Sequence, residues 1–198
     1  MNPDIIIETD SVIKRFRSVD SFDRELRIYQ LCLPFVPRLI SFSGTEEIVL
    51  ERIPGIPYLD DREFFDPFLL GQTIALFHQA TSSGDKCICH MDNNPKNILR
   101  SEAGYFLIDF SESGLAYPES DLTHLLLFWI GHFPDKDLLI HKAALIQGYS
   151  SIRSLNQEHW NTYIGESYDR FVSRREQYGK PLSAILSDRT ATERLLRL

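Results

Sequence analysis

Two short segments in the middle of the chain carry residue types that could bind a metal ion and move a proton. Residues 90–99 read HMDNNPKNIL, and residues 107–110 read LIDF. The pattern predicts a β-hairpin with its turn at residues 101–104, which returns Asp109 to the region where Asn97 begins. A carboxylate and an amide oxygen brought together in this way are suitable hard ligands for Mg²⁺. The spacing therefore predicts a magnesium site at the open end of the hairpin.

Asp92 supplies a third polar group for the same region. It lies five residues before Asn97, in a loop that Pro95 keeps from becoming helical. Magnesium held by one or two protein ligands and by phosphate oxygens is the usual arrangement for phosphoryl transfer. Each polar residue alone would be interpreted as a loop or turn former, but the set at this spacing favours a catalytic site.

A buried ion pair is predicted near the beginning of the chain. Residues 11–16 are typical of a strand, and residues 21–33 of a helix capped by Ser21. Alternation places Lys14 on an apolar side of the strand, and helical periodicity places Glu25 on an apolar stripe. Because an unpaired buried charge is costly, each charge accounts for the other. The alternative, in which both side chains are solvated at the rim, stays open.

The remaining pattern divides the sequence into a β-rich first part and a helical second part. The expected strands are Asp4–Glu8, Ser11–Phe16, Leu39–Phe42 and Glu47–Ile53. The run Pro54-Gly55-Ile56-Pro57 then breaks the pattern and marks the expected boundary between two lobes. The expected later helices are Phe68–Thr81, Asp121–Gly131, Asp137–Gln147, Glu158–Arg175 and Pro181–Leu198.

The pattern H-x-D-x-x-x-x-N followed by I-D-F resembles the catalytic and metal loops of the protein-kinase-like superfamily. Within it, the chain looks most like the aminoglycoside phosphotransferase and choline kinase group, whose loop commonly reads H-G-D-x-x-P-x-N. The resemblance continues along most of the chain in the same order. Its matches in the first part are Val12-Ile13-Lys14, Phe22-Asp23-Arg24-Glu25 and residues 48–55. Its matches in the second part are Leu76-Phe77-His78 and residues 118–122.

The resemblance implies an α+β, two-lobed protein-kinase-like fold. A reduced, β-rich amino-terminal lobe would comprise residues 1–53, and a helical carboxy-terminal lobe would comprise residues 54–198. Residues 48–55 look like the hinge strand beside the adenine of a nucleotide. The carbonyl of Glu51 and the amide of Ile53 are then the expected adenine contacts.

The same resemblance assigns roles to the chemical residues, with ATP and Mg²⁺ as cofactors. Lys14, held by Glu25, would steady the nucleotide phosphates. Asn97 and Asp109 would hold magnesium, and Asp92 would accept or orient the proton of an acceptor hydroxyl. The helices that follow would form the acceptor pocket.

Two departures from the kinase pattern shape the expected function. Asp121, the next matching residue, follows Asp109 by only twelve residues, and no alanine-proline-glutamate signature appears, so there is no room for a long activation segment. Protein kinases also place a lysine where this chain has Asn94. These features favour a small molecule, a sugar or a lipid headgroup as acceptor over a peptide.

The second departure is the lack of a glycine-rich phosphate loop. None of the thirteen residues before Lys14 is glycine, and Gly44 is the first glycine of the chain. The lid over the phosphates is then truncated, replaced by residues 4–8 and their turn, or supplied by another segment. Two alternatives to phosphotransfer therefore stay open: a pseudokinase or nucleotide-binding regulatory module without turnover, and transfer of another part of the nucleotide such as AMP. Ser111 also replaces the glycine that follows the metal loop, a change of little weight.

Composition and charge limit the classes of partner. The chain has 43% hydrophobic and 25% charged residues, and no apolar run approaches the roughly 20 residues that span a membrane. The net charge of −7 makes nucleic acid an unlikely partner. From Arg170 onward, however, seven basic residues stand against three acidic ones. This basic carboxy-terminal segment is expected to pack on an acidic body, with contact to an anionic partner, or to phosphate through Arg174 or Arg175, as the alternative.

The cysteines indicate the compartment. Cys32, Cys87 and Cys89 are odd in number, and the last two form a CxC pair, which is not the CxxC spacing of redox and metal sites. The acidic first residues also lack the basic start and apolar stretch of a signal peptide. We therefore expect reduced cysteines and a cytoplasmic location.

Overall fold

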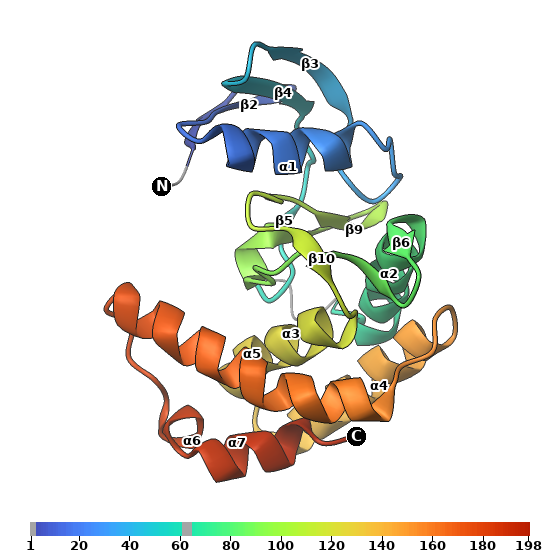
Figure 1. Ribbon diagram of the computed structural model, residues 1–198, viewed down its shortest axis with the longest axis vertical. Helices are drawn as coiled ribbons and strands as arrows, with labels where there is room; N and C mark the ends of the chain where they lie inside the picture. Colours follow the sequence, from blue (N-terminus) through green and yellow to red (C-terminus); the bar gives the residue numbers. More distant parts are fainter. Residues whose placement is uncertain (1–2, 61–64) are drawn as a thin grey trace. The chain divides into compact units, whose positions relative to one another are not determined.

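The computed structural model describes residues 3–60 and 65–198 (Figure 1). The chain divides into two compact units, each made of two separate stretches of sequence. Unit 1 comprises Met1–Phe65 and Pro95–Gly114, and unit 2 comprises Asp66–Asn94 and Leu115–Leu198. The lobes predicted at residues 1–53 and 54–198 divide the chain differently, and that division stays a prediction.

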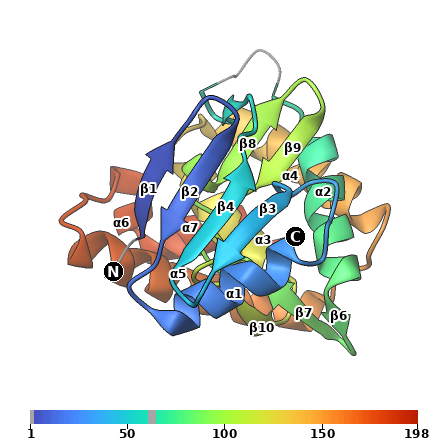
Figure 2. The same ribbon diagram turned by 90° about the horizontal axis from the view of Figure 1, so that it is seen from above.

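Unit 1 contains two antiparallel sheets and one long helix. The larger sheet has the strand order β1-β2-β4-β3, which Figure 2 shows from above. Its strands are β1 (Asp4–Ile7), β2 (Ser11–Arg15), β3 (Leu39–Ser43) and β4 (Glu47–Glu51), and the helix α1 (Val19–Tyr29) follows β2. The smaller sheet has the order β5-β8-β9, with β5 at Ile56–Pro57, β8 at Ile98–Ser101 and β9 at Gly104–Leu107. The four strands expected before Pro54 are all present.

The N-cap of helix α1 lies three residues before the predicted one, Ser21. The extended Ser18, not Ser21, is the N-cap, and its hydroxyl accepts a hydrogen bond from the Ser21 amide at 3.4 Å. The inward face carries Phe22 and Ile28, which are buried with Glu25. Ser18 and Ser21 lie within one turn of each other, and local pattern alone does not distinguish which of them caps the helix.

The predicted hairpin is confirmed, and its register fixes the residues that follow it. Ile98 pairs with Leu107, and Ser101 pairs with Gly104 across the turn. Beyond the ladder, the Ile108 amide donates to the Asn97 carbonyl at 2.9 Å. Asp109 therefore emerges one residue past the partner of Asn97, at the open end of the hairpin.

Unit 2 is mainly helical. Its helices are α2 (Pro67–Ala80), α3 (Glu119–Ile130), α4 (Asp135–Ser150), α5 (Gln157–Gln177), α6 (Ala184–Ser187) and α7 (Arg189–Leu196). A small sheet of order β10-β7-β6 joins them, with β6 at Ser82–Ser83, β7 at Lys86–Cys89 and β10 at Gly114–Ala116. Sequence pattern missed these short strands. Across the described parts of the chain, no helix is both long enough and apolar enough to cross a bilayer.

The single helix predicted over Pro181–Leu198 is wrong, because the segment breaks at Asp188. This residue has an extended backbone, and its side chain accepts from the Ala191 amide at 3.0 Å, which starts α7. An aspartate that bonds to the backbone in this way favours a new helix start over helix continuation.

Two glycines allow α2 and α4 to pack closely. A Cβ atom added to Gly148 would overlap the carbonyl of Phe68, and one added to Gly71 would overlap the carbonyl of Leu145. The backbones of the two helices are therefore in direct contact at both positions. Glycine is required here for space, because neither backbone has a left-handed conformation at these residues.

Replacing Gly148 by alanine should lower the free energy of unfolding by about 3 kcal/mol, because the added methyl group meets backbone atoms that a side-chain rotation cannot remove. Gly165→Ala is a matched helical control, since its added carbon would approach only the end of the Arg189 side chain, at 3.3 Å. The control should be neutral or stabilise the protein by up to about 1 kcal/mol. Urea unfolding measures both, and equal effects would contradict the close helix contact.

Candidate active site

Lys14 lies at the centre of a buried ion cluster in unit 1. Its ammonium group contacts both carboxylate oxygens of Glu25, at 2.5 and 2.7 Å, and Oδ1 of Asp109 at 2.9 Å. The Lys14 side chain is 5% exposed and that of Glu25 is fully buried, whereas the Asp109 carboxylate is 33% exposed. The ion pair inferred from the burial pattern is thus present, and a rim position for these two side chains is ruled out. Their role toward phosphates stays a prediction.

The cluster changes the proton affinity of Glu25. Burial raises the pKa of Glu25 from 4.5 to about 7; the charge of Lys14 opposes this rise, and the charge of Asp109 adds to it. Two carboxylates that share one ammonium group therefore compete for its charge. A second cation near Asp109 would relieve this competition.

Asp109 adopts an unusual backbone conformation at the end of the hairpin. Its φ of 65° lies in the left-handed region, which aspartate tolerates better than most residues. The Asp109 amide donates to the Tyr29 hydroxyl at 3.4 Å, and the Ser111 hydroxyl donates to Oδ1 of Asp109 at 3.2 Å. Tyr29 is itself buried and stacks edge-on against Phe110, at 5.7 Å between ring centroids. Local packing therefore holds the carboxylate in place.

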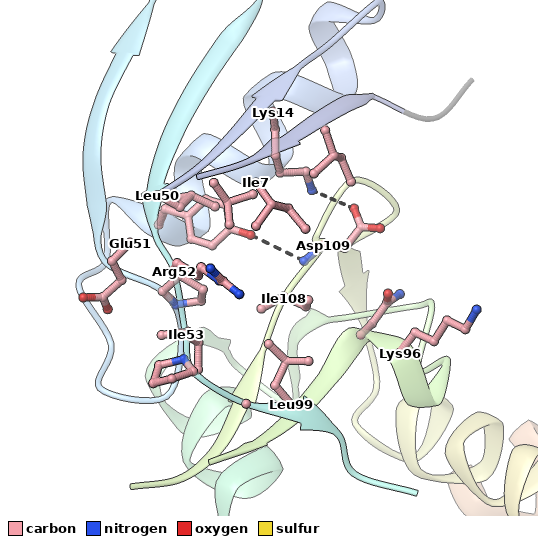
Figure 3. A pocket seen from close by; sticks show the side chains of 17 residues that line it. Ile7, Lys14, Leu50, Glu51, Arg52, Ile53, Lys96, Leu99, Ile108 and Asp109 are labelled. Atoms are coloured by element: carbon pink, nitrogen blue, oxygen red, sulfur yellow. Dashed lines mark hydrogen bonds and ion pairs between the residues drawn. The ribbon is translucent and has the colours of Figure 1, made fainter. Parts of the chain in front are cut away.

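Lys14, Tyr29 and Asp109 line a cavity of about 420 Å³ within unit 1 (Figure 3). Such a volume suits a small molecule or cofactor. Apolar side chains form most of its wall, among them Ile5, Ile7, Val12, Leu50, Leu99 and Ile108. Its polar lining includes Lys14, Asn97 and Asp109, and the predicted adenine-binding residues Glu51 and Ile53 line it as well. The structure thus brings six of the seven predicted site residues into one unit, five of them at this cavity with Glu25 behind Lys14.

Glu51 at the end of β4 lines the cavity, but its side chain points away from it (Figure 3). The Glu51 carboxylate accepts from the Arg38 amide at 2.8 Å, and Figure 3 shows it directed away from the cavity. The Gly55 amide then closes a tight turn onto the Ile53 carbonyl at 2.9 Å. The arrangement suits contact through main-chain atoms, as the resemblance implies.

The donor set of this cavity fits a magnesium ion. Asn97 offers an amide oxygen and Asp109 a carboxylate, and both residues line the cavity. Hard oxygen ligands of this kind, with room for phosphate oxygens beside them, match what Mg²⁺ requires.

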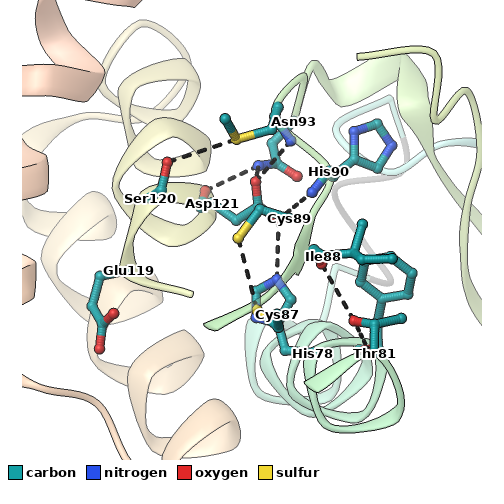
Figure 4. Close-up of polar contacts among 12 residues, drawn as sticks. His78, Thr81, Cys87, Ile88, Cys89, His90, Asn93, Glu119, Ser120 and Asp121 are labelled. Carbon is teal, nitrogen blue, oxygen red and sulfur yellow. Dashed lines mark hydrogen bonds and ion pairs between the residues drawn. The ribbon is translucent and has the colours of Figure 1, made fainter. Parts of the chain in front are cut away.

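The predicted catalytic loop lies in unit 2, where Asp121 anchors it (Figure 4). The carboxylate of Asp121 accepts from the amides of His90 and Met91, at 2.6 and 2.9 Å, and from the side-chain amide of Asn93 at 2.9 Å. His78 Nε2 completes the set at 3.0 Å. Asp92 therefore lies between residues that are fixed on both sides by one carboxylate.

The anchor is charged, and the backbone that it holds is strained. Burial alone would raise the pKa of Asp121, but its hydrogen bond with His78 and the nearby imidazoles and amide hold that pKa well below its usual range. Met91 has a φ of 66°, a conformation that costs a non-glycine residue about 1–2 kcal/mol. It occupies the position where the related loop pattern has glycine.

His78 is fully buried, and both of its ring nitrogens have partners. Both are side chains: Tyr149 at 3.0 Å from Nδ1, and Asp121. The ligand atoms of His78, Cys87 and Cys89 also lie within 4.8 Å of one another. Hydrogen bonding to Cys87 and burial raise the pKa of Cys89 well above its usual value, so Cys89 remains a thiol. All three cysteines are free in the structure.

One contact at the catalytic loop was missed from the sequence. Arg174 of α5 lies 3.6 Å from Oδ2 of Asp92. The basic segment from Arg170 onward was expected to pack on an acidic body, with a phosphate contact of Arg174 or Arg175 as the alternative. The i, i+4 spacing of Arg170 and Arg174 was the available signal, since it puts both on one face of a helix.

Comparison with known proteins supports the resemblance. Residues 58–155, just under half of the chain, match the model of the phosphotransferase enzyme family, APH. Among curated proteins, no sequence matches that of this chain.

Solved structures agree over nearly the whole length. The choline kinase LicA from Streptococcus pneumoniae has a TM-score of 0.60 at 16% identity, over 97% of this chain and 88% of that chain. The amicoumacin kinase hAmiN, in complex with AMP-PNP, Ca²⁺ and Ami, has a TM-score of 0.64 at 14% identity, over 98% of this chain and 88% of that chain. The ethanolamine kinase of Plasmodium vivax has a TM-score of 0.63 at 12% identity, over 98% of this chain and 81% of that chain.

At such identities the likeness establishes the fold. The chain has an α+β protein-kinase-like fold, which it shares with the choline, amicoumacin and ethanolamine kinases named above. The fold class and the resemblance predicted from the sequence are confirmed.

The raised pKa of Glu25 predicts a pH-dependent stability. Because the folded pKa of about 7 exceeds 4.5, the stabilising contribution of protonated Glu25 is complete below pH 4.5 and is lost as the pH rises through 7. The free energy of unfolding of wild type, relative to Glu25→Gln, should therefore fall between pH 5 and 8, by on the order of 3 kcal/mol at most.

Urea unfolding at several pH values measures this difference. Glu47→Gln is the control, because its carboxylate pairs with Arg15 at the surface and contributes little. If the free energy of unfolding of wild type relative to Glu25→Gln instead rises with pH, the charge of Lys14 outweighs the effect of burial and the pKa of Glu25 is lowered.

Proposed function

We propose that this protein is an ATP- and Mg²⁺-dependent phosphotransferase that acts on a hydroxyl group of a small molecule, a sugar or a lipid headgroup. One observation carries the proposal: Lys14, paired with Glu25 and Asp109, lines the same 420 Å³ cavity as Asn97 and the backbone at Glu51 and Ile53. A nucleotide needs such a combination of an apolar wall, exposed main chain and a cation beside hard oxygen ligands. Solved structures with the same fold include a choline kinase, an amicoumacin kinase and an ethanolamine kinase.

Each residue has a defined task in this proposal. Lys14 binds the nucleotide phosphates, and Glu25 fixes its ammonium group. Asn97 and Asp109 hold magnesium, which when bound neutralises charge on the transferring phosphoryl group. Asp92 takes the proton of the acceptor hydroxyl. The acceptor oxygen then bonds to the γ-phosphorus, the bond from that phosphorus to the β–γ bridging oxygen breaks, and ADP leaves.

Strand β1 stands in place of the glycine-rich loop. Ile5 pairs with Lys14, and Ile7 pairs with Val12, so that the side chains of Ile5 and Ile7 reach the cavity. This agrees with a lid replaced by residues 4–8. Apolar side chains cannot donate hydrogen bonds to a γ-phosphate, so ATP should be preferred only weakly over ADP.

The lack of glycine in the β1–β2 turn also favours a second candidate, a nucleotide-binding regulatory module without turnover. The retained set of Lys14, Glu25, Asp92, Asn97 and Asp109 favours the enzyme. The free cysteines support the cytoplasm as its compartment.

A panel of alcohols, sugars and lipid headgroups, assayed for Mg²⁺-dependent formation of ADP, tests the proposal. At least one acceptor should stimulate turnover. With that acceptor, Asp92→Asn should lower kcat by roughly a hundredfold or more while nucleotide affinity stays near wild type, because a general base contributes on that order. Asp109→Asn should weaken binding of magnesium–nucleotide itself.

Asp169→Asn is the control, since this carboxylate is exposed and pairs with Arg189. It should change neither quantity. Nucleotide binding without turnover for every acceptor would establish the regulatory module instead. Small and equal effects of Asp92→Asn and Asp109→Asn would contradict the assigned roles.

A further inference from the structure

Two arginines of α5 concentrate positive charge at the catalytic loop. Arg174 lies 3.6 Å from the Asp92 carboxylate. One turn earlier, Arg170 points at the adjacent residue, with Nη1 at 3.5 Å from the Met91 sulfur, and Nη2 donates to the Ser120 hydroxyl at 3.2 Å. The Nε atom of Arg170 is buried without a hydrogen-bond partner among the described residues. Both guanidinium groups thus face the loop that carries the proposed base.

The positive charge of these two arginines acts on His124 in helix α3. Burial and the charge of Arg170, with a smaller contribution from Arg174, together lower the pKa of His124 to about 3 against the opposing charge of Asp121. Arg170 and Arg174 therefore act on one region from the same side of α5.

The next arginine along the chain has a different task. Both Nε and Nη2 of Arg175 donate to the Pro181 carbonyl, at 3.2 and 2.8 Å, and its guanidinium lies over the Phe171 ring. Arg175 thus fastens the end of α5 to the following segment, whereas Arg174 is turned to Asp92. The chain offers two adjacent arginines with separate roles.

The contact of Arg174 with Asp92 is loose enough to be exchanged. At 3.6 Å, with side chains 29% and 21% exposed, it is an ion pair without a close hydrogen bond. Partly exposed pairs of this kind contribute only about 0–1 kcal/mol. A carboxylate or phosphate that takes both donors of a guanidinium in a bidentate contact binds more strongly. An anionic ligand could therefore replace Asp92 on Arg174 and leave Asp92 to accept a proton.

We propose that the acceptor carries an anionic group, a carboxylate or a phosphate, near its reactive hydroxyl, and that Arg174 binds this group with Arg170 beside it. The inference rests on the proposed phosphotransferase function and narrows its substrate class. A cationic acceptor, such as a choline-like alcohol, would meet two guanidinium groups at the base, and like charges in this position disfavour binding.

A series of three-carbon acceptors, together with the general panel, tests the charge preference. Glycerol is neutral, 3-amino-1,2-propanediol is cationic, D-glycerate carries a carboxylate, and glycerol 3-phosphate carries a phosphate. The acceptors with the highest kcat/KM, in this series and in a panel sorted by charge, should be anionic. Carboxylate and phosphate members distinguish the two forms of the anion.

Variants locate the effect. Arg174→Ala should raise KM for the best anionic acceptor by roughly tenfold to a hundredfold, the range of a charge-assisted contact. It should raise KM for the anionic acceptor more than KM for glycerol, and it should leave the affinity for ATP unchanged. Arg174→Lys should restore part of the loss, because it keeps the charge without the fork. Arg175→Ala is the matched control and should not alter KM, with its melting temperature recorded to detect loss of folding.

The outcomes separate the two proposals. Turnover that is best with a neutral or cationic acceptor, or equal KM changes in the Arg174 and Arg175 variants, would overturn the anionic acceptor while leaving the phosphotransferase intact. Absence of turnover with every charge class would overturn the phosphotransferase, and the acceptor class with it.

Discussion

The buried ammonium group of Lys14 is the interaction on which the candidate site depends. A charge that is 5% exposed must be compensated, and here two carboxylates from different elements do so. Glu25 comes from α1 and Asp109 from the end of the β8–β9 hairpin, so one cation connects the sheet, the helix and the hairpin. The cavity takes its shape from the same three elements. Removal of Lys14 would leave the buried Glu25 carboxylate without its cation, which makes the cluster a constraint on the fold as well as on the chemistry.

The second constraint is backbone held against its preference. Met91 and Asp109 both have a left-handed backbone conformation although neither is glycine. Met91 precedes Asp92, the proposed base, and Asp109 is itself a proposed magnesium ligand. Different groups hold them: Asp121 accepts from the Met91 amide, and Lys14 and Tyr29 hold Asp109. Strain of this kind persists only where the surroundings over-determine the conformation, and it concentrates at functional sites. The two loops therefore have a common design, in which a buried charged group fixes a strained residue.

Sequence pattern was sufficient where the determinants are local. The hairpin turn, the strand alternation at Lys14 and the helical stripe at Glu25 each lie within a few residues, and together they predicted the ion pair and the open hairpin end. It was insufficient where distant elements decide. The partners of His78 come from α3 and α4, and Arg174 meets Asp92 across more than eighty residues of sequence. Sequence pattern failed to predict the Ser18 cap and the helix break at Asp188 for another reason. Each feature depends on which of several capable side chains bonds to the backbone.

The central claim is that the cavity at Lys14 binds the phosphates of a nucleotide without a glycine-rich loop. Calorimetric titration of ATP and ADP, with and without Mg²⁺, into wild type and Lys14→Ala tests it most directly. Circular dichroism would first establish that the variant is folded. The account predicts that wild type binds magnesium–ATP only slightly more tightly than magnesium–ADP, that affinity falls without Mg²⁺, and that Lys14→Ala loses roughly tenfold or more, the range of a hydrogen bond to a charged group. Tight binding of ATP that survives in a folded Lys14→Ala protein would contradict this account of the site.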